Sequence, residues 1–283
     1  MKTEFYKPTN LKSALELLEK HKGTAVIVNG GSDIVQKISD GLVEPGAIIY
    51  VADVAELKSI TERDGKIVIG GAVTYDAMLN NPLIQKVPGL VLAVRQLASP
   101  AIRRVATPAG NIGTCAPSAD CTTMLVALGA KVVLASAGGE QEVAVEALFT
   151  GSYKTTIANN ELIKEICFDA PKTGDGSGYI RLARRKAQDI GNVLVGASLT
   201  VKDGVCTKAN IGLGALAPTS IRGADIEVAI VGKNKDAALE YVRKIFPKDA
   251  KLRDDRFKDY KELVTCTAVE RAVAMAWNNA QGV

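Results

Sequence analysis

Short apolar runs alternate with stretches of helical periodicity along this chain. Residues 24–28 and 47–51 are compact runs rich in β-branched residues, which is typical of buried strands. Residues 11–18 place their leucines mainly on one helical face, and residues 88–98 form an apolar helix that halts at Ser99-Pro100. The mixture predicts an α+β fold in which short strands and helices share a core.

Turn and cap signals divide the rest of the first half. The Asp64-Gly65 pair predicts a hairpin, and Thr74 is expected to cap a helix. An edge strand is expected at residues 5–6 and a short helix at 34–38. Further strands are expected at residues 131–135, 141–145 and 161–168.

Residues 170–178 form the stretch richest in glycine, proline and serine, and they predict a domain boundary. Three β runs follow, at residues 178–183, 193–201 and 207–216. Amphipathic helices are expected at residues 235–245 and 260–277. The second domain is therefore predicted to be small, with a three-stranded antiparallel sheet and helices.

The polar stretch at residues 107–120 separates apolar segments on both sides. It contains two glycines and two prolines, so we expect no regular element to run through it. A polar loop that leads into a helix N-terminus is well built to receive an anion, because free N–H groups point outward there. The alternative is a long surface connection, but the apolar flanks favour a loop that lies against a core.

A second junction of the same kind occurs at residues 29–33, between a strand run and a short helix. Gly30 and Gly31 allow close approach of the backbone, and the N–H groups of Ser32 and Asp33 would begin the helix. Two such loops suit a dinucleotide, which has a pyrophosphate and a long polar linker to hold. Neither loop shows the G-x-G-x-x-G pattern after a strand, so a Rossmann fold is not supported.

Composition excludes several classes of function. The 283 residues are 47% hydrophobic and 23% charged, a globular balance, and the net charge of +4 is too small to indicate nucleic-acid binding. No run approaches the roughly 20 apolar residues of a membrane helix, and the start of the chain lacks the apolar core of a signal peptide. We expect a cytoplasmic protein without membrane insertion.

Cysteine and histidine offer little catalytic chemistry. The five cysteines lack metal-ligand spacing, and Cys115 and Cys121 have no second pair or histidine nearby. The only histidine, His21, ends the first helical pattern. We therefore expect reduced thiols, no metal site and no catalytic side chain.

Several motifs together resemble the flavoprotein (medium) subunits of the molybdenum hydroxylase family, of the xanthine dehydrogenase and carbon monoxide dehydrogenase type. The two loops resemble the FAD-holding loops of that family, and residues 99–103 look like the segment that enters the second loop. Residues 181–189 resemble the motif that opens the family's C-terminal domain, and Asp255-Arg256 with Tyr260-Lys261 resembles a helix near its end. The resemblance covers the whole chain.

The resemblance implies a two-part FAD-binding domain of the vanillyl-alcohol-oxidase/PCMH type at residues 1–172, with parts at about 1–55 and 56–172. A C-terminal domain of the carbon monoxide dehydrogenase flavoprotein type would follow at 177–283. Two departures stand out: Ala109-Gly110 replaces two adjacent glycines of the family, and Pro108 replaces a β-branched residue. Both would leave the second loop with fewer amides for phosphate.

The resemblance also implies a role for individual residues in binding FAD non-covalently. The first loop would wrap the pyrophosphate, Asp120 would accept from ribityl or ribose hydroxyls, and Leu97 and Ile163 would flank the isoalloxazine. Arg181 would lie near the pyrimidine end, where a cation stabilises the charge of the reduced ring. The implied cofactor-binding residues are Val28, Asn29, Gly30, Gly31, Ser32, Asp33, Leu97, Thr107, Ala109, Gly110, Asn111, Thr114, Asp120, Ile163 and Arg181.

In such a family, a molybdopterin-binding large subunit hydroxylates the substrate and a 2Fe-2S small subunit passes single electrons to the flavin, which reduces NAD or another acceptor. The neighbours Arg184, Arg185 and Lys186 are expected to pair with acids or to contact another subunit. Two alternatives remain open: a self-sufficient flavin reductase of the same fold, such as the UDP-N-acetylenolpyruvoylglucosamine reductase type, and a non-catalytic assembly protein.

Overall fold

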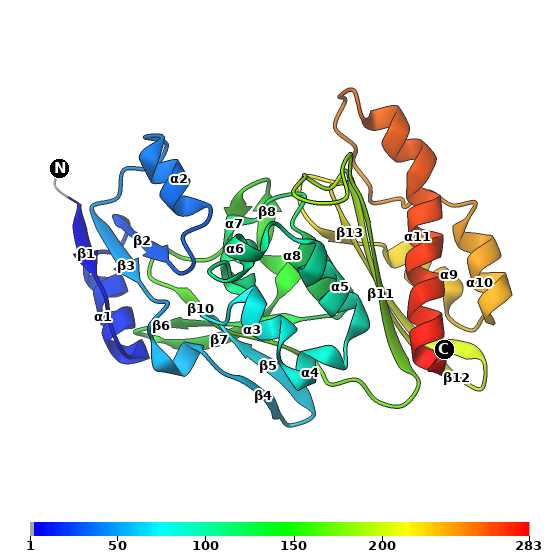
Figure 1. The fold of residues 1–283 in the computed structure, drawn as a ribbon, viewed down its shortest axis with the longest axis horizontal. Helices are drawn as coiled ribbons and strands as arrows, with labels where there is room; N and C mark the ends of the chain where they lie inside the picture. The colour runs from blue at the N-terminus through cyan, green and yellow to red at the C-terminus, as the bar shows by residue number, and fades with distance from the viewer. Residues whose placement is uncertain (1–2, 283) are drawn as a thin grey trace.

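The computed structural model describes residues 3–282. Figure 1 shows the larger sheets in a row along the long axis, with the N-terminus at one end and helix α11 at the other. Most of the helices between α3 and α8 lie in the middle of the row. The chain thus passes from one sheet to the next in sequence order.

The first sheet has three parallel strands in the order β1-β3-β2. Its strands are β1 (Glu4–Tyr6), β2 (Ala25–Val28) and β3 (Ala47–Tyr50), joined through α1 (Leu11–Lys20) and α2 (Ile34–Ser39). Asn10 begins α1 by accepting a hydrogen bond from the N–H of Ser13. The predicted strands and helices of this region are confirmed.

The middle sheet has five strands in the order β4-β5-β10-β6-β7, paired antiparallel. They are β4 (Ile60–Arg63), β5 (Lys66–Gly70), β10 (Leu162–Asp169), β6 (Lys131–Ser136) and β7 (Gly139–Ala144). A short hairpin, β8 (Phe149–Gly151) and β9 (Lys154–Thr155), precedes β10, and short turns η1 (Ala55–Leu57) and η2 (Val145–Leu148) precede β4 and β8.

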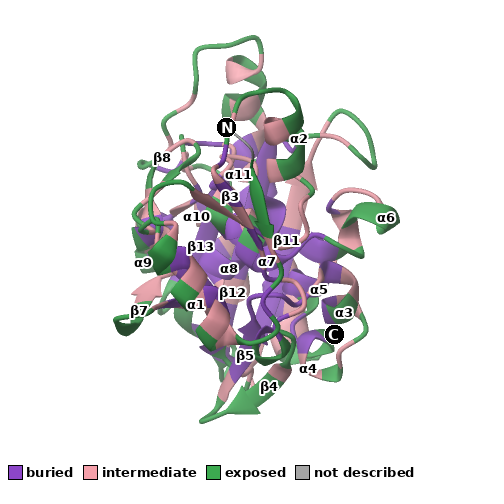
Figure 2. Ribbon diagram, turned by 90° about the vertical axis from the view of Figure 1, so that its left-hand side faces the viewer, coloured by how far each residue is buried: buried purple, intermediate pink, exposed green. Residues whose placement is uncertain are grey.

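Helices cover this sheet and form the largest core with it. Figure 2 shows buried residues concentrated in this interior, whereas α2, α6 and β4 carry exposed residues. The predicted cap of Thr74 on α3 is confirmed, because its hydroxyl accepts from the N–H of Ala77. The helices are α3 (Tyr75–Leu79), α4 (Pro82–Gln85), α5 (Pro88–Gln96), α6 (Pro100–Arg103), α7 (Pro108–Thr114) and α8 (Asp120–Ala127).

The C-terminal sheet is antiparallel, in the order β11-β12-β13-β14. Its long strands are β11 (Asp175–Leu182), β12 (Val193–Lys202) and β13 (Val205–Gly214). The prediction of three strands was one too few, because the two-residue β14 (Ile221–Arg222) pairs with β13 and is too short to leave an alternating pattern. Strand β11 also begins inside the stretch predicted to be a linker.

Helices lie on both faces of the C-terminal sheet. Helix α11 (Lys258–Gln281) packs so closely on one face that a Cβ atom at Gly178 would lie 2.4 Å from the carbonyl oxygen of Ala272. On the other face, a Cβ at Gly212 would lie 2.2 Å from the carbonyl oxygen of Thr123 in α8. Glycine is needed at both contacts. Helices α9 (Ala224–Ile230) and α10 (Lys235–Val242) complete the domain.

The expectation that no regular element crosses residues 107–120 is wrong. Helix α7 occupies residues 108–114, and α8 begins at Asp120. The hydroxyl of Thr107 caps α7, and Pro108 occupies its first turn, where proline costs no hydrogen bond. Cys115 ends the helix in the left-handed conformation. The expectation that this stretch lies against a core is confirmed, since Thr107 and Ala109 are buried.

Candidate functional site

A cavity of about 1120 Å³ opens where the first sheet, the middle helices and the start of the C-terminal domain meet. Its walls come mainly from residues within the segments 25–37, 97–120, 153–163 and 184–190. The volume slightly exceeds the range of about 300–1,000 Å³ for small-molecule sites, which suits a ligand of dinucleotide size.

Most of the residues predicted to bind a cofactor line this one cavity. Val28 and Arg181 are not part of its wall. The wall includes Asn29, Gly30, Gly31, Ser32, Asp33, Leu97, Thr107, Ala109, Gly110, Asn111, Thr114, Asp120 and Ile163. Two loops separated by more than 70 residues are thereby brought to one place.

The first loop offers a run of backbone donors. The N–H groups of residues 30–33 donate to no acceptor among the described residues. Gly31 has φ of +70°, a conformation that L side chains rarely adopt. Asn29 fixes the start of the loop, because its amide group donates to the carbonyl oxygen of Gly71. A run of N–H groups without acceptors beside a cavity is suited to an anion.

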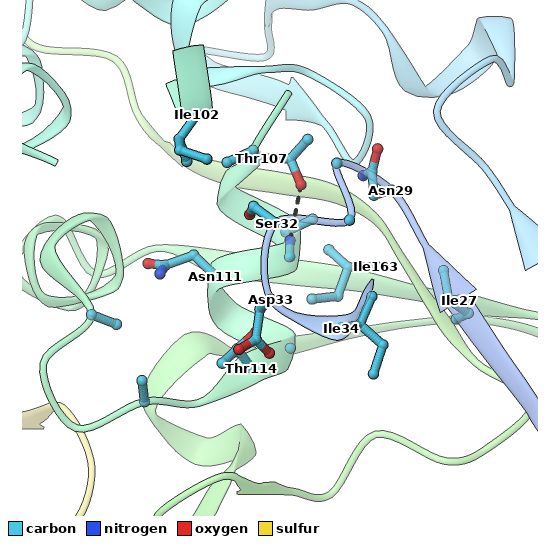
Figure 3. Close-up of a pocket in the computed structure, with 18 of the residues that line it drawn as sticks. Ile27, Asn29, Ser32, Asp33, Ile34, Ile102, Thr107, Asn111, Thr114 and Ile163 are labelled. Atoms are coloured by element: carbon cyan, nitrogen blue, oxygen red, sulfur yellow. Dashed lines mark hydrogen bonds between the residues drawn. The ribbon is translucent and has the colours of Figure 1, made fainter. Parts of the chain in front are cut away.

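The two loops contact each other directly. The hydroxyl of Thr114 donates to a carboxylate oxygen of Asp33 over 3.2 Å, and Figure 3 shows the two side chains facing each other. The same carboxylate oxygen lies 2.7 Å from the ammonium of Lys37, one turn further along α2. This contact holds the first loop against α7.

Helix α7 contributes differently from the first loop. Its cap uses the Thr107 hydroxyl, which accepts from the N–H of Gly110 over 3.0 Å, drawn as the dashed line in Figure 3. Asn111 turns its amide oxygen to α8, where it accepts from the hydroxyl of Thr122 over 2.9 Å. A Cβ at Gly113 would meet no atom within 4 Å, so the helix presents open space to the cavity at that residue.

Apolar side chains complete the wall. Leu97 and Ile163 are each 9% exposed and line the cavity, as predicted. Tyr75 also lines it, and its buried hydroxyl has no hydrogen-bond partner among residues 3–282. From the sequence, this region is expected only to begin a helix capped by Thr74, because the strand-like and helical patterns around it give no sign that Tyr75 reaches the cavity.

Asp120 and Arg181 form a buried ion pair at the start of α8. The Arg181 guanidinium donates to Asp120 over 2.8 Å, and the hydroxyl of Tyr179 donates to the same oxygen over 2.8 Å. Burial raises the pKa of Asp120, although Arg181 and Tyr179 oppose that shift. The Arg181 side chain is only 4% exposed, so it lies behind Asp120 and not on the cavity wall.

The connection between β11 and β12 forms one rim of the cavity. Arg184 and Arg185 lie 3.0 and 3.7 Å from the carboxylate of Asp189, which confirms the expectation that they pair with acids. The bond from Arg184 lowers the pKa of Asp189 to about 2. Arg181 anchors this connection by donating to the backbone carbonyl of Asp189. That these residues line the cavity was not predicted, because the basic run alone indicates only a charged turn.

Comparison with protein-family models identifies both halves of the chain. Residues 1–170 match the family described as "FAD binding domain in molybdopterin dehydrogenase". The chain belongs to this family. Residues 178–276 match the "CO dehydrogenase flavoprotein C-terminal domain". The chain is thus an FAD-binding medium subunit of the molybdenum hydroxylase type, and the resemblance seen in the sequence is confirmed.

Individual relatives agree with this assignment. The chain is 30% identical to the nicotinate dehydrogenase FAD-subunit of Eubacterium barkeri over 81% of this chain and 79% of that protein. It is 27% identical to the carbon monoxide dehydrogenase medium chain of Hydrogenophaga pseudoflava over 97% and 96%. The solved carbon monoxide dehydrogenase from Hydrogenophaga pseudoflava superposes with a TM-score of 0.90, at 26% identity, over 99% of this chain and 98% of that chain.

The residues present fit FAD. The unpaired amides of residues 30–33 match the charge of a pyrophosphate, and the apolar surface at Leu97 and Ile163 matches a planar ring system. Among residues 3–282 no helix combines the length and the apolar character needed to cross a membrane.

Proposed function

We propose that this chain carries electrons between a partner and a soluble acceptor by holding FAD in the cavity described above. When bound, FAD takes up electrons singly and releases them in pairs, which is chemistry that no side chain of this protein supplies. The observation that supports the proposal best is the run of unpaired amides at residues 30–33 beside a cavity of dinucleotide size.

In this proposal the chain's own residues bind and orient the cofactor. The amides of residues 30–33 receive the pyrophosphate, and α7 supplies the opposite side through Thr107 and Asn111. Leu97 and Ile163 hold the isoalloxazine between them. Asp120 accepts from a hydroxyl of the cofactor, and Arg181 keeps Asp120 ionised and in place.

The partners would be a molybdopterin-binding large subunit and a 2Fe-2S small subunit, and NAD or another acceptor would take the electron pair. Solved relatives support these partners by their names, since one is called a "Cu,Mo-CO Dehydrogenase". The domain bounds 1–172 and 177–283, the role of Arg181 toward the flavin and a cytoplasmic location stay predictions.

The experiment is an absorbance spectrum of the purified chain or complex, followed by acid precipitation. We expect flavin absorbance, with FAD released to the supernatant, because the one histidine of the chain, His21, is not part of the cavity wall and so offers no covalent link. FAD retained in the pellet, FMN in its place, or a colourless protein would each contradict the proposal. Turnover of a substrate by the isolated chain would instead favour the self-sufficient reductase.

A further inference from the structure

Tyr153 is an exposed aromatic residue on the cavity wall, and the fold alone does not explain it. It lies in the turn between β8 and β9, with 62% of its surface exposed, so it adds little to a core. Its φ is +59°, a left-handed conformation that glycine or asparagine usually occupies. A bulky residue held in this conformation points to a function for the side chain.

The turn that carries Tyr153 is tied to the end of α7. The N–H of Tyr153 donates to the carbonyl oxygen of Cys115 over 2.9 Å. The thiol of Cys115 donates in turn to the carbonyl oxygen of Gly151 over 3.4 Å. These two bonds fix the position of the turn relative to α7, so the ring stays at the cavity wall.

Lys37 joins this ring to the amide loop. Its ammonium lies 5.3 Å from the centre of the Tyr153 ring and 2.7 Å from the carboxylate of Asp33. Asp33 also accepts from Thr114 of α7. Helix α2, helix α7 and the β8–β9 turn are therefore linked by side chains that all line the cavity next to residues 30–33.

The position of this group indicates which half of a dinucleotide it would contact. In the proposed function, on which this inference rests, Leu97 and Ile163 hold the isoalloxazine and the pyrophosphate lies at residues 30–33. Leu97 is held by Arg103, ahead of the N-terminal end of α7, whereas Tyr153 is bonded to Cys115 at its C-terminal end. The adenosine is therefore placed at the Tyr153 end of the cavity. Lys37 supplies a cation beside the phosphate site, and an exposed tyrosine ring is a surface on which a purine stacks.

We propose that Tyr153 and Lys37 recognise the adenosine diphosphate half of FAD and so select FAD over FMN. The ring of Tyr153 stacks with the adenine base. Lys37 holds this ring and the amide loop in fixed positions relative to each other and offsets part of the phosphate charge. FMN lacks the adenosine and the second phosphate, so it gains nothing from either residue.

The experiment measures dissociation constants of the flavin-stripped full chain for FAD and for FMN by flavin fluorescence. Tyr153→Ala should raise the constant for FAD about tenfold, as expected for loss of one stacked base, and leave that for FMN within about twofold. Lys37→Ala should raise the constant for FAD about fivefold. ADP should compete with FAD for binding to the parent chain. The inhibition constant of ADP should be about tenfold higher for Tyr153→Ala.

Matched variants separate recognition from general damage. Tyr153→Phe keeps the ring and should bind FAD like the parent. Tyr260→Ala removes another exposed tyrosine, one that is not part of the cavity wall. Lys20→Ala breaks a similar pair, in which the ammonium lies 5.8 Å from the Tyr6 ring. Both controls should leave FAD binding unchanged.

An equal loss of FAD and FMN affinity in Tyr153→Ala would overturn the inference, because the residue would then act only through the shape of the cavity. Unchanged FAD affinity would overturn it as well. A parent chain that binds no FAD would contradict the proposed function itself, which is a different result from either of these.

Discussion

The two sides of the cavity are built from opposite kinds of polar group. On the N-terminal side, the amides of residues 30–33 have no partner among the described residues, and these residues line the cavity. On the C-terminal side, Tyr179 and Arg181 are buried and both donate to one carboxylate oxygen of Asp120. Groups without partners are available to a ligand, whereas groups that are already paired fix the position of the wall. The first side should therefore govern affinity and the second side stability.

The largest effect is expected from Arg181→Ala. Removal of the guanidinium leaves the buried Asp120 carboxylate without its cation, which should lower the free energy of unfolding by about 3–5 kcal/mol. Chemical denaturation of parent and variant measures this. Arg63→Ala, which breaks an ion pair of the same 2.8 Å length with an exposed arginine, should cost under about 1 kcal/mol.

A double variant tests the reason for that loss. Asp120→Ala together with Arg181→Ala leaves no charge unpaired, so it should recover part of the stability. A double variant that is as unstable as the sum of both single variants would show that the pair acts only through packing.

Gly31→Val should have the opposite effect to Arg181→Ala. The variant should lose flavin and keep its fold. A Cβ at Gly31 would lie 3.0 Å from Val35, and a β-branched residue is strained at φ of +70°. We expect the purified variant to keep less than about a tenth of the parent's flavin, measured by absorbance. Gly41→Val has the same strain at φ of +69° but faces open space, and it should keep its flavin.

Thr107→Ala should lower both the stability of the chain and its affinity for FAD, each by less than the two variants above. Loss of the α7 cap should lower the free energy of unfolding by about 1 kcal/mol and weaken FAD binding, whereas Thr107→Ser should behave like the parent. Thr74→Ala removes the same kind of cap from α3 and should lower stability alone. Equal flavin affinity in both alanine variants would place α7 outside the binding surface.

The smallest effect concerns pH. Burial raises the pKa of Asp120 above its ordinary value of 3.8, so the folded chain binds this proton more tightly than the unfolded chain. The contribution of Asp120 to stability should therefore fall as pH rises from 3.8 through the raised pKa. Melting curves of parent and Asp120→Asn should converge at the acid end of this range and separate above it. A difference between the two melting temperatures that grows toward low pH would contradict a raised pKa of Asp120.

The comparison of the two sides also explains which features the sequence could predict. Strands, caps and the first loop depend on local patterns, and the Gly30-Gly31 pair after a strand run was a sufficient signal. Helix α7 was not predicted, because its glycines and proline were taken to exclude a helix. Thr107 nevertheless caps α7, and Pro108 lies in its first turn, where proline is tolerated. Composition alone does not distinguish a loop from a capped helix.

The position of Arg181 depended on long-range packing and could not be predicted from its motif. Arg181, Arg184 and Arg185 are close in sequence, yet Arg181 points behind Asp120 while the other two line the cavity. Strand β11 ends at Leu182, so Arg181 is held within the sheet and its neighbours follow the connection outward. The contact between Thr114 and Asp33 is likewise a result of tertiary structure.

Hydrogen exchange at the amides of residues 30–33 in the flavin-stripped chain, with and without FAD, shows directly whether these amides bind the cofactor. We expect fast exchange without FAD and strong protection when FAD is bound, because the cofactor becomes the acceptor that these N–H groups lack. The turn amides at Asp64-Gly65 should exchange at the same rate in both states. Unchanged exchange at residues 30–33 in a chain saturated with FAD would contradict the central claim.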